Sequence, residues 1–277
     1  MKHDDDFFTG NESDITGHAA AFVVSEAWRA VAERGRFTLS LSGGRTPAGL
    51  YRKLASGIEP ELPDRFGIPT PEPAEAFHEG LIVMPWTQTF LFWGDERCVT
   101  QDHPDSNYRM ARETMLDEPS TEGVKAFRMP CDGLPPHEAA KKYEHTIRTI
   151  LGGTENQGSE IIPVFDFILL GLGEDGHTAS LFPGDRVTLE ETQRLVVAVT
   201  PALASPPVHR LTMTLLLINR AKTICFLTSG TERAAMAEAI RKNKAPVSWP
   251  ARLVRPLNGR MVWFISLPSP DSPRRSP

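Results

Sequence analysis

One stretch constrains the fold more than any other: a nearly continuous apolar run, Val164 to Leu170, leads directly into GLGEDGH at residues 171–177. An apolar run of this length is typical of a strand that is buried on both faces, as strands of parallel sheets are. In open α/β sheets ligands bind at the carboxyl ends of the strands, which is where this run meets three glycines, two acids and a histidine. The stretch therefore predicts a central strand that ends in a functional loop.

Helical and strand-like patterns alternate along the chain. Amphipathic spacing and capping signals predict helices over residues 17–34, 48–55, 106–116, 136–151 and 231–241. Short apolar or alternating runs predict strands over residues 37–41, 87–93, 164–170, 195–199, 209–218, 223–228 and 262–266. This alternation indicates an α/β fold: a single Rossmann-like domain with a mainly parallel sheet that helices flank on both faces.

Local composition sets the expected limits of that domain. We expect it to span residues 17–266, after a flexible N-terminal segment at residues 1–16 and before a disordered tail at residues 267–277. Residues 57–80 carry five prolines and little periodicity, which indicates a loop or insertion inside the domain.

The charge balance and the cysteines exclude several classes of protein. The net charge is −5, so the chain lacks the basic excess that nucleic-acid or anionic-membrane binding shows. Its three cysteines form no CxxC pair, which fits a reducing compartment and not a disulfide scaffold or a zinc knuckle. The acidic N-terminus lacks the apolar region of a secretory signal, and no apolar run is long enough to span a membrane. We expect a cytoplasmic monomer or weak homo-oligomer with no nucleic-acid or membrane partner.

Three predicted strands end alike, in a polar loop with glycine that runs into a helix or turn, at residues 42–46, 171–177 and 229–233. Loop glycines let backbone N–H groups converge on an anion, and a following helix adds its positive end. With Arg45, Arg97 and Arg233 nearby in sequence, the loops indicate a phosphate or carboxylate site. Each loop alone also fits an ordinary βα turn, and none is a P-loop, because GxxxxGK[ST] is absent.

The glycines at residues 171–176 also satisfy GxGxxG, the fingerprint of a dinucleotide-binding strand and helix. That fingerprint must open a long helix, yet Pro183-Gly184 follows Gly176 after a few residues. Glu174 and Asp175 would also face a pyrophosphate with the wrong charge. The dinucleotide interpretation is therefore disfavoured, and we expect no such cofactor.

His177 is the candidate for acid–base chemistry. An imidazole with an ordinary pKa of about 6.5 can take a proton from water near neutrality, and Glu174 or Asp175 could orient it. The alternative is a histidine that merely caps the next short helix. A metal site built from the same three residues lacks the support of an HExxH motif or a second nearby histidine, so we expect no metal.

Asp95-Glu96-Arg97 follows another predicted strand. Arg97 could bind an anion, and Asp95 could orient a partner or abstract a proton. The alternative is a surface ion-pair cluster, the usual role of such triplets. By default, Ser106-Asn107 is a helix N-cap and Arg210 is a surface charge at a strand end.

The order of these motifs along the chain is distinctive. Together they resemble the 6-phosphogluconolactonase family over about residues 17 to 265: LSGGRTP at 41–47, WGDERCV at 93–99, DSNYRMARE at 105–113, GLGEDGHTASLFPG at 171–184, HRLTMTLLLINRAK at 209–222 and SGTER at 229–233. GEDGHTASLFPG is the most specific of them.

The resemblance implies hydrolysis of 6-phospho-D-glucono-1,5-lactone to 6-phospho-D-gluconate, a step of the pentose phosphate pathway, without metal or cofactor. His177 matches the family's general base, with Asp175 and Glu174 as candidate partners. The substrate-binding residues that we predict are Ser42, Gly43, Gly44, Arg45, Thr46, Asp95, Arg97, Asn107, Arg210 and Arg233. The family often has Lys at the position of Arg233. The Arg in this chain keeps the positive charge but has a different donor geometry.

Two rival functions remain open from the sequence. In the related glucosamine-6-phosphate deaminases the loop after the histidine resembles Ile-Ala-Phe-Asn-Glu-Pro-Gly, with a Glu that assists ring opening. Here residues 178–184 read TASLFPG, without a Glu, which favours the lactonase. A non-catalytic sugar-phosphate sensor would keep the anion loops, but the intact His177 speaks against it. No G-x-S-x-G elbow is present, so a base and water, without a serine nucleophile, are expected to act on the lactone.

Overall fold

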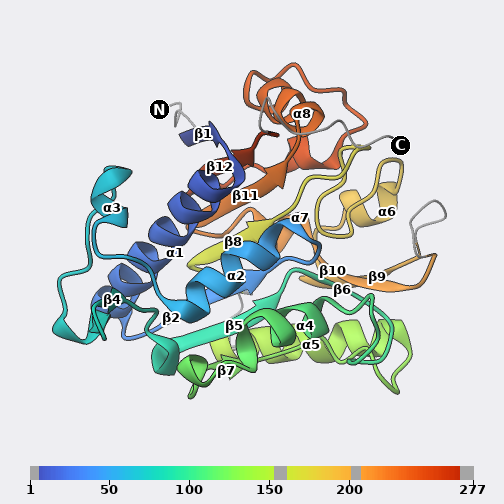
Figure 1. Cartoon of the computed structure of the whole chain (residues 1–277). Coiled ribbons are helices and arrows are strands. Elements are labelled where there is room, and N and C mark those ends of the chain that lie inside the picture. The colour runs from blue at the N-terminus through green and yellow to red at the C-terminus, as the bar shows by residue number, and fades with distance from the viewer. Residues whose placement is uncertain (1–5, 153–160, 201–206, 269–277) are drawn as a thin grey trace.

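The computed structural model describes residues 6–152, 161–200 and 207–268. Its centre is a seven-stranded sheet in the order β1-β12-β11-β8-β2-β5-β7, and every neighbouring pair is parallel (Figure 1). The strands are β1 (Asp6–Gly10), β2 (Phe37–Leu41), β5 (Thr89–Trp93), β7 (Lys125–Ala126), β8 (Phe167–Leu170), β11 (Thr223–Ser229) and β12 (Arg260–Ser266).

Helices cover this sheet, and the predicted α/β class is confirmed. The long helices α1 (Glu12–Arg34) and α2 (Thr46–Ser56) pack side by side, while α8 (Thr231–Arg241) packs against β11 and β12 (Figure 1). Helix α5 (Pro136–Leu151) lies near β5, where the hydroxyl of Tyr143 accepts a hydrogen bond from the backbone N–H of Trp93 at 2.8 Å. None of the described helices is long and apolar enough to cross a membrane.

The expected central strand, β8, lies between β11 and β2 and is fully buried. It begins at Phe167, later than predicted. Asp166, directly before the strand, is instead held by polar contacts at the amino end of β8. The Asp166 carboxylate accepts hydrogen bonds from the backbone N–H and hydroxyl of Thr38 and pairs with Lys222 at 3.0 Å. A charged residue in a buried strand is tolerated when it is paired and hydrogen-bonded in this way.

A second, antiparallel sheet of three strands was not expected as a separate unit. It consists of β6 (Asp95–Arg97), β10 (Arg210–Met213) and β9 (Val196–Val199), in the order β6-β10-β9. The predicted strand over residues 209–218 is wrong in its second half, because Leu215–Ile218 forms the short helix α7. Thr214 ends the strand, and its hydroxyl donates to the carbonyl of Arg194 at 2.8 Å.

The prediction of a flexible segment at residues 1–16 is wrong for residues 6–16. Strand β1 pairs with β12 in parallel register, and α1 begins at Glu12, five residues earlier than the predicted helix. The side chain of Asn11 caps α1 by accepting a hydrogen bond from the backbone N–H of Asp14 at 2.9 Å. A polar cap followed by acids in the first turn was the signal for this earlier start.

The Pro-rich stretch at residues 57–80 is irregular but carries short elements of its own. These are the single helical turn α3 (Leu62–Arg65), the 3₁₀ turn η1 (Ala74–Ala76) and strand β3 (Phe77–His78), which pairs with β4 (Leu81–Ile82). Ile58 and Ile82 are both buried and form an isolated antiparallel bridge, so the stretch is attached to the domain core. The predicted disordered tail lies outside the described residues from residue 269 onward.

Candidate active site

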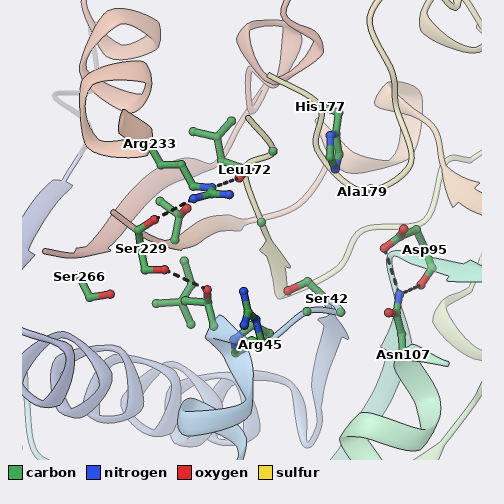
Figure 2. Close-up of a pocket in the computed structure, with 18 of the residues that line it drawn as sticks. Ser42, Arg45, Asp95, Asn107, Leu172, His177, Ala179, Ser229, Arg233 and Ser266 are labelled. Carbon is green, nitrogen blue, oxygen red and sulfur yellow. Dashed lines mark hydrogen bonds between the residues drawn. The ribbon is translucent and has the colours of Figure 1, made fainter. Parts of the chain in front are cut away.

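A cavity of about 620 Å³ opens at the carboxyl ends of the parallel strands (Figure 2). Loops after β2, β8 and β11 and the strands of the second sheet contribute to its wall. The predicted site residues that line it are Ser42, Gly43, Gly44, Arg45, Thr46, Asp95, Arg97, Asn107, His177, Arg210 and Arg233. Residues that lie far apart in the sequence thus meet at one edge of the sheet, as the strand-end rule predicts.

His177 is held by Asp175, two residues before it. The Nδ1 atom of the imidazole lies 2.6 Å from Oδ1 of Asp175, and the same oxygen accepts the backbone N–H of His177 at 3.0 Å. Burial opposes ionisation of Asp175, but the hydrogen bonds and charge of His177 outweigh it, so the pKa of Asp175 lies below its ordinary value. A carboxylate on Nδ1 leaves the opposite nitrogen, Nε2, to exchange a proton with a ligand or water.

Glu174 is not the hydrogen-bond partner of the imidazole, which is the role that the sequence left open for it. Its carboxylate pairs instead with Nη2 of Arg233 at 2.9 Å. Neither Glu174 nor Asp175 lines the cavity itself. Of the two acids that the sequence left open, Asp175 is therefore the one that orients His177.

Two glycines of the loop are required by its packing. A Cβ on Gly173 would lie 2.1 Å from Nδ1 of His177, and Gly176, with φ of +82°, has the Trp249 side chain at 2.3 Å from an added Cβ. No long helix opens at Gly176: the next described helix is the short α6 (Arg186–Leu189). The glycines thus make room for the imidazole and for Trp249, and the dinucleotide interpretation lacks its supporting helix.

The triplet at residues 95–97 is a buried strand and not a surface ion-pair cluster. Glu96 accepts hydrogen bonds from the backbone N–H groups of Asn107 and Tyr108, both at 2.8 Å, at the start of α4 (Asn107–Ala111). Burial raises the pKa of Glu96 despite these bonds. Ser106 is the N-cap of α4, as expected, and donates to Glu96 at 3.1 Å.

Asp95 joins the histidine loop to the second sheet and α4. Its Oδ2 accepts from the Ser180 hydroxyl at 2.6 Å, and its carbonyl accepts from the side-chain amide of Asn107 at 2.8 Å (Figure 2). Oδ1 of Asn107 and Nε of Arg97 are buried without a hydrogen-bond partner among the described residues. Since buried polar atoms are nearly always paired, these two atoms in the cavity wall indicate a polar ligand.

Arg97 and Arg210 face each other across the β6–β10 pair. Burial, and then the positive charge of Arg97, lower the pKa of Arg210. Two neighbouring guanidinium groups in one wall form a strongly cationic surface that suits an anionic or electron-rich ligand. Neither residue is thus an ordinary surface charge.

A further cationic group lies across the cavity. Arg233 donates to the carbonyls of Leu172 at 3.1 Å and Ser229 at 3.3 Å (Figure 2) and pairs with Glu174, so three contacts fix its guanidinium. Thr46 is the first residue of α2, with Arg45 at the N-cap, and the Thr46 hydroxyl lies 3.4 Å from Oγ of Ser229.

The sequence reasoning missed several residues of the wall. Ser266 ends β12 at the same edge, and the strand-end rule could have found it. Ser229, at the end of β11, lies in the loop at residues 229–233 that the sequence indicates, but it is not among the predicted site residues. Glu12 and Thr16 also line the cavity. They were missed because the start of α1 was placed too late.

Comparison with known proteins identifies the family of the chain. A family model described as glucosamine-6-phosphate isomerases/6-phosphogluconolactonase matches residues 10–263. The chain belongs to this family. Among members of the glucosamine-6-phosphate isomerase/6-phosphogluconolactonase family, a 6-phosphogluconolactonase of Synechocystis sp. is 36% identical over 92% of both chains. That of Bos taurus is 34% identical over 91% of this chain and 87% of its own.

Solved structures of the family have the same fold. The 6-phosphogluconolactonase of Thermotoga maritima superimposes with a TM-score of 0.73 at 26% identity, over 94% of this chain and 99% of that chain. The 6-phosphogluconolactonase of Trypanosoma cruzi gives 0.74 at 26% identity, over 96% of both chains. A monomeric glucosamine-6-phosphate deaminase gives 0.66 at 18% identity, which shows a shared fold alone.

Proposed function

We propose that this chain is a 6-phosphogluconolactonase that hydrolyses 6-phospho-D-glucono-1,5-lactone to 6-phospho-D-gluconate in the oxidative branch of the pentose phosphate pathway. The observation that carries the proposal is the His177–Asp175 pair at 2.6 Å, whose imidazole lines a cavity together with Arg97, Arg210 and Arg233. A base beside several fixed cations suits hydrolysis of an anionic ester. The named lactonases among the relatives support the same reaction.

His177 acts as the general base in this proposal. Asp175 holds the Nδ1–H tautomer, so Nε2 takes a proton from a water molecule as the water oxygen attacks the lactone carbonyl. The tetrahedral intermediate then collapses, the ring C–O bond breaks, and the proton passes to the leaving ring oxygen. The sum is one water consumed and one carboxylate, one hydroxyl and one released proton formed, without a covalent enzyme intermediate. Ser180 is no nucleophile in this scheme, because its side chain is fully buried and does not line the cavity.

The cationic groups and the glycine loop bind the substrate. We place the phosphate at the N-terminus of α2, where Gly43 and Gly44 offer backbone N–H groups and Arg233 offers a fixed guanidinium. Arg97 and Arg210 are then available to the lactone end of the substrate, where a guanidinium stabilises the oxyanion that develops during attack. The buried Oδ1 of Asn107 is an acceptor for a sugar hydroxyl.

Deamination of glucosamine 6-phosphate is the second candidate, and one contact disfavours it. Phe182 stands before Pro183-Gly184, where the deaminase loop carries its Glu. Its ring centroid lies 4.9 Å from that of His177, so an apolar ring occupies the place of a carboxylate beside the base. A non-catalytic sugar-phosphate sensor would have no use for the oriented His177.

We extend the proposal to the protein's setting. A lactone is an activated ester, so water and one base suffice, and we propose that the enzyme needs no metal or cofactor. We further propose a single catalytic domain that works in the cytoplasm as a monomer or weak homo-oligomer, with the phosphosugar lactone as its small-molecule partner.

One paired assay tests the reaction. Acid release from freshly made 6-phosphogluconolactone is followed in a pH-stat and corrected for spontaneous hydrolysis, with ammonia release from glucosamine 6-phosphate as the counter-test. Enzyme-dependent acid release without ammonia is the expected result. Ammonia release alone would make the chain a deaminase, and activity on neither substrate would favour the sensor.

A further inference from the structure

The ring of Phe182 contacts both groups on which the proposed reaction depends. Its centroid lies 4.9 Å from that of the His177 imidazole, with 35° between the planes, and 5.4 Å from the guanidinium carbon of Arg210. Phe182 is not among the described residues that line the cavity. It therefore reaches the base and the cation without forming part of the surface that faces the substrate.

The backbone around Phe182 is fixed from two directions. The N–H of Leu181 donates to the carbonyl of Thr178 at 2.9 Å, which closes a tight turn after His177. Ser180 ties the same turn to the second sheet, through the Thr212 hydroxyl at 3.2 Å and the Asp95 carboxylate at 2.6 Å. The aromatic side chain thus projects from an anchored turn, so the position of its ring is defined.

An aromatic ring suits this place for two physical reasons. Its electron-rich face attracts a guanidinium within about 6 Å of its centroid, which restrains the flexible end of Arg210. The same ring packs against the imidazole at a separation typical of aromatic pairs. An aliphatic side chain of similar size supplies neither the quadrupole nor the flat, rigid surface.

We propose that Phe182 is a positioning residue that holds the imidazole of His177 and the guanidinium of Arg210 at a fixed separation for attack on the lactone. The inference rests on the proposed lactonase activity and adds to it a residue outside the cavity wall. It also accounts for Phe182 being only half-buried and outside the hydrophobic core of the described residues.

The test compares Phe182→Leu and Phe182→Tyr with the wild type. Loss of the ring should lower kcat by about 10- to 100-fold, because base and cation lose their alignment. It should raise KM by about 2- to 30-fold, the range expected for losing one cation–π contact to a substrate-binding arginine. Phe182→Tyr keeps the ring and should have kcat and KM close to those of the wild type. If only apolar volume mattered, Phe182→Leu would be at least as active as Phe182→Tyr.

A matched control exists elsewhere in the chain. Phe66 also contacts a histidine and an arginine, with the His18 ring at 4.3 Å and the Arg65 guanidinium carbon at 5.5 Å, but neither His18 nor Arg65 lines the cavity. Phe66→Leu should lower the melting temperature and leave kcat and KM unchanged. Phe182→Leu should show the opposite pattern.

Two further variants keep the outcome decisive. Phe182→Met retains a flexible apolar side chain and serves if the Leu variant does not fold. Wild-type kcat and KM in Phe182→Met would overturn the positioning role. In an Arg210→Gln background, Phe182→Leu should raise KM no further, because the two changes remove one interaction; full additivity would also overturn the proposal. A wild-type enzyme without lactonase activity would instead refute the proposed function, so the two failures are distinguishable.

Discussion

One oxygen of Asp175 lies 2.6 Å from Nδ1 of His177 and also accepts the backbone N–H of His177 at 3.0 Å. The same carboxylate therefore orients the imidazole and fixes the turn that carries it. This double contact within three consecutive residues makes the histidine loop a self-contained unit for acid–base chemistry.

His177 is expected to be essential. His177→Ala removes the proposed base and should lower kcat by about 10²- to 10⁴-fold, with a small change in KM, because the phosphate contacts remain. The measurement is acid release from the lactone after subtraction of the uncatalysed rate. A variant with wild-type kcat would show that another group activates the water.

Asp175 and Glu174 should differ in their effect although they are neighbours. Asp175→Asn removes the charge that holds the Nδ1–H tautomer and should lower kcat by about 10²-fold or more. Glu174→Gln is the matched control: its carboxylate is exposed and pairs with Arg233, so kcat should stay close to that of the wild type. Equal losses in the two variants would contradict the assignment of Asp175.

Gly173 should be irreplaceable even by alanine. The added Cβ would lie 2.1 Å from Nδ1 of His177, so the imidazole must leave its place beside Asp175. We expect kcat to fall by about 10²-fold, as for other displacements of about 1 Å at a reacting centre. Gly49→Ala in α2, where an added Cβ meets only ordinary contacts at 3.6 Å, is the control and should leave kcat unchanged. A fully active Gly173→Ala variant would mean that the imidazole works from another position.

Much of this site could be predicted from the sequence, because strand ends of a parallel sheet meet at one edge. That rule alone brought Ser42, His177 and Ser229–Arg233 together. The rule does not predict contacts between residues that are far apart in the sequence. Trp249 packs on Gly176, and Phe182 lies against Arg210, but no local sequence pattern indicates either contact. Such partners depend on tertiary packing, which overrides local pattern.

The start of the chain illustrates a different limit. Its acidic composition suggested flexibility, yet Phe7 and Phe8 lie in β1 and pack against the core. A five-residue edge strand has too short a pattern to outweigh composition, and its pairing with β12 depends on residues about 250 positions away. The misplaced start of α1 then hid Glu12 and Thr16 from the predicted site.

Arg233 should act on binding more than on chemistry. Arg233→Gln removes a fixed cation from the proposed phosphate end and should raise KM by about 10- to 100-fold with little change in kcat. Arg233→Lys keeps the charge but not the contacts to Leu172 and Ser229, so its KM should lie between that of the wild type and that of Arg233→Gln. Inhibition by inorganic phosphate should weaken in parallel. A loss confined to kcat would place Arg233 at the lactone end instead.

His18 predicts how stability depends on pH, independently of the reaction. It is buried among Phe8, Phe66 and Phe264, and burial lowers its pKa to about 4, with Asp6 opposing the shift. The unfolded chain, with an ordinary histidine pKa of about 6.5, binds the proton more readily between these values. Stability is therefore complete above about pH 6.5 and falls towards pH 4, by up to about 3 kcal/mol.

Replacing the ring with one that cannot titrate isolates this effect. His18→Phe keeps an aromatic side chain in the cluster and should flatten the pH dependence of the unfolding free energy between pH 4.5 and 6.5, as measured by urea denaturation. His145→Gln, at an exposed position on α5, should leave the wild-type slope in place. If both variants retain that slope, another group binds the proton on unfolding, and His18 is not the source of the acid sensitivity.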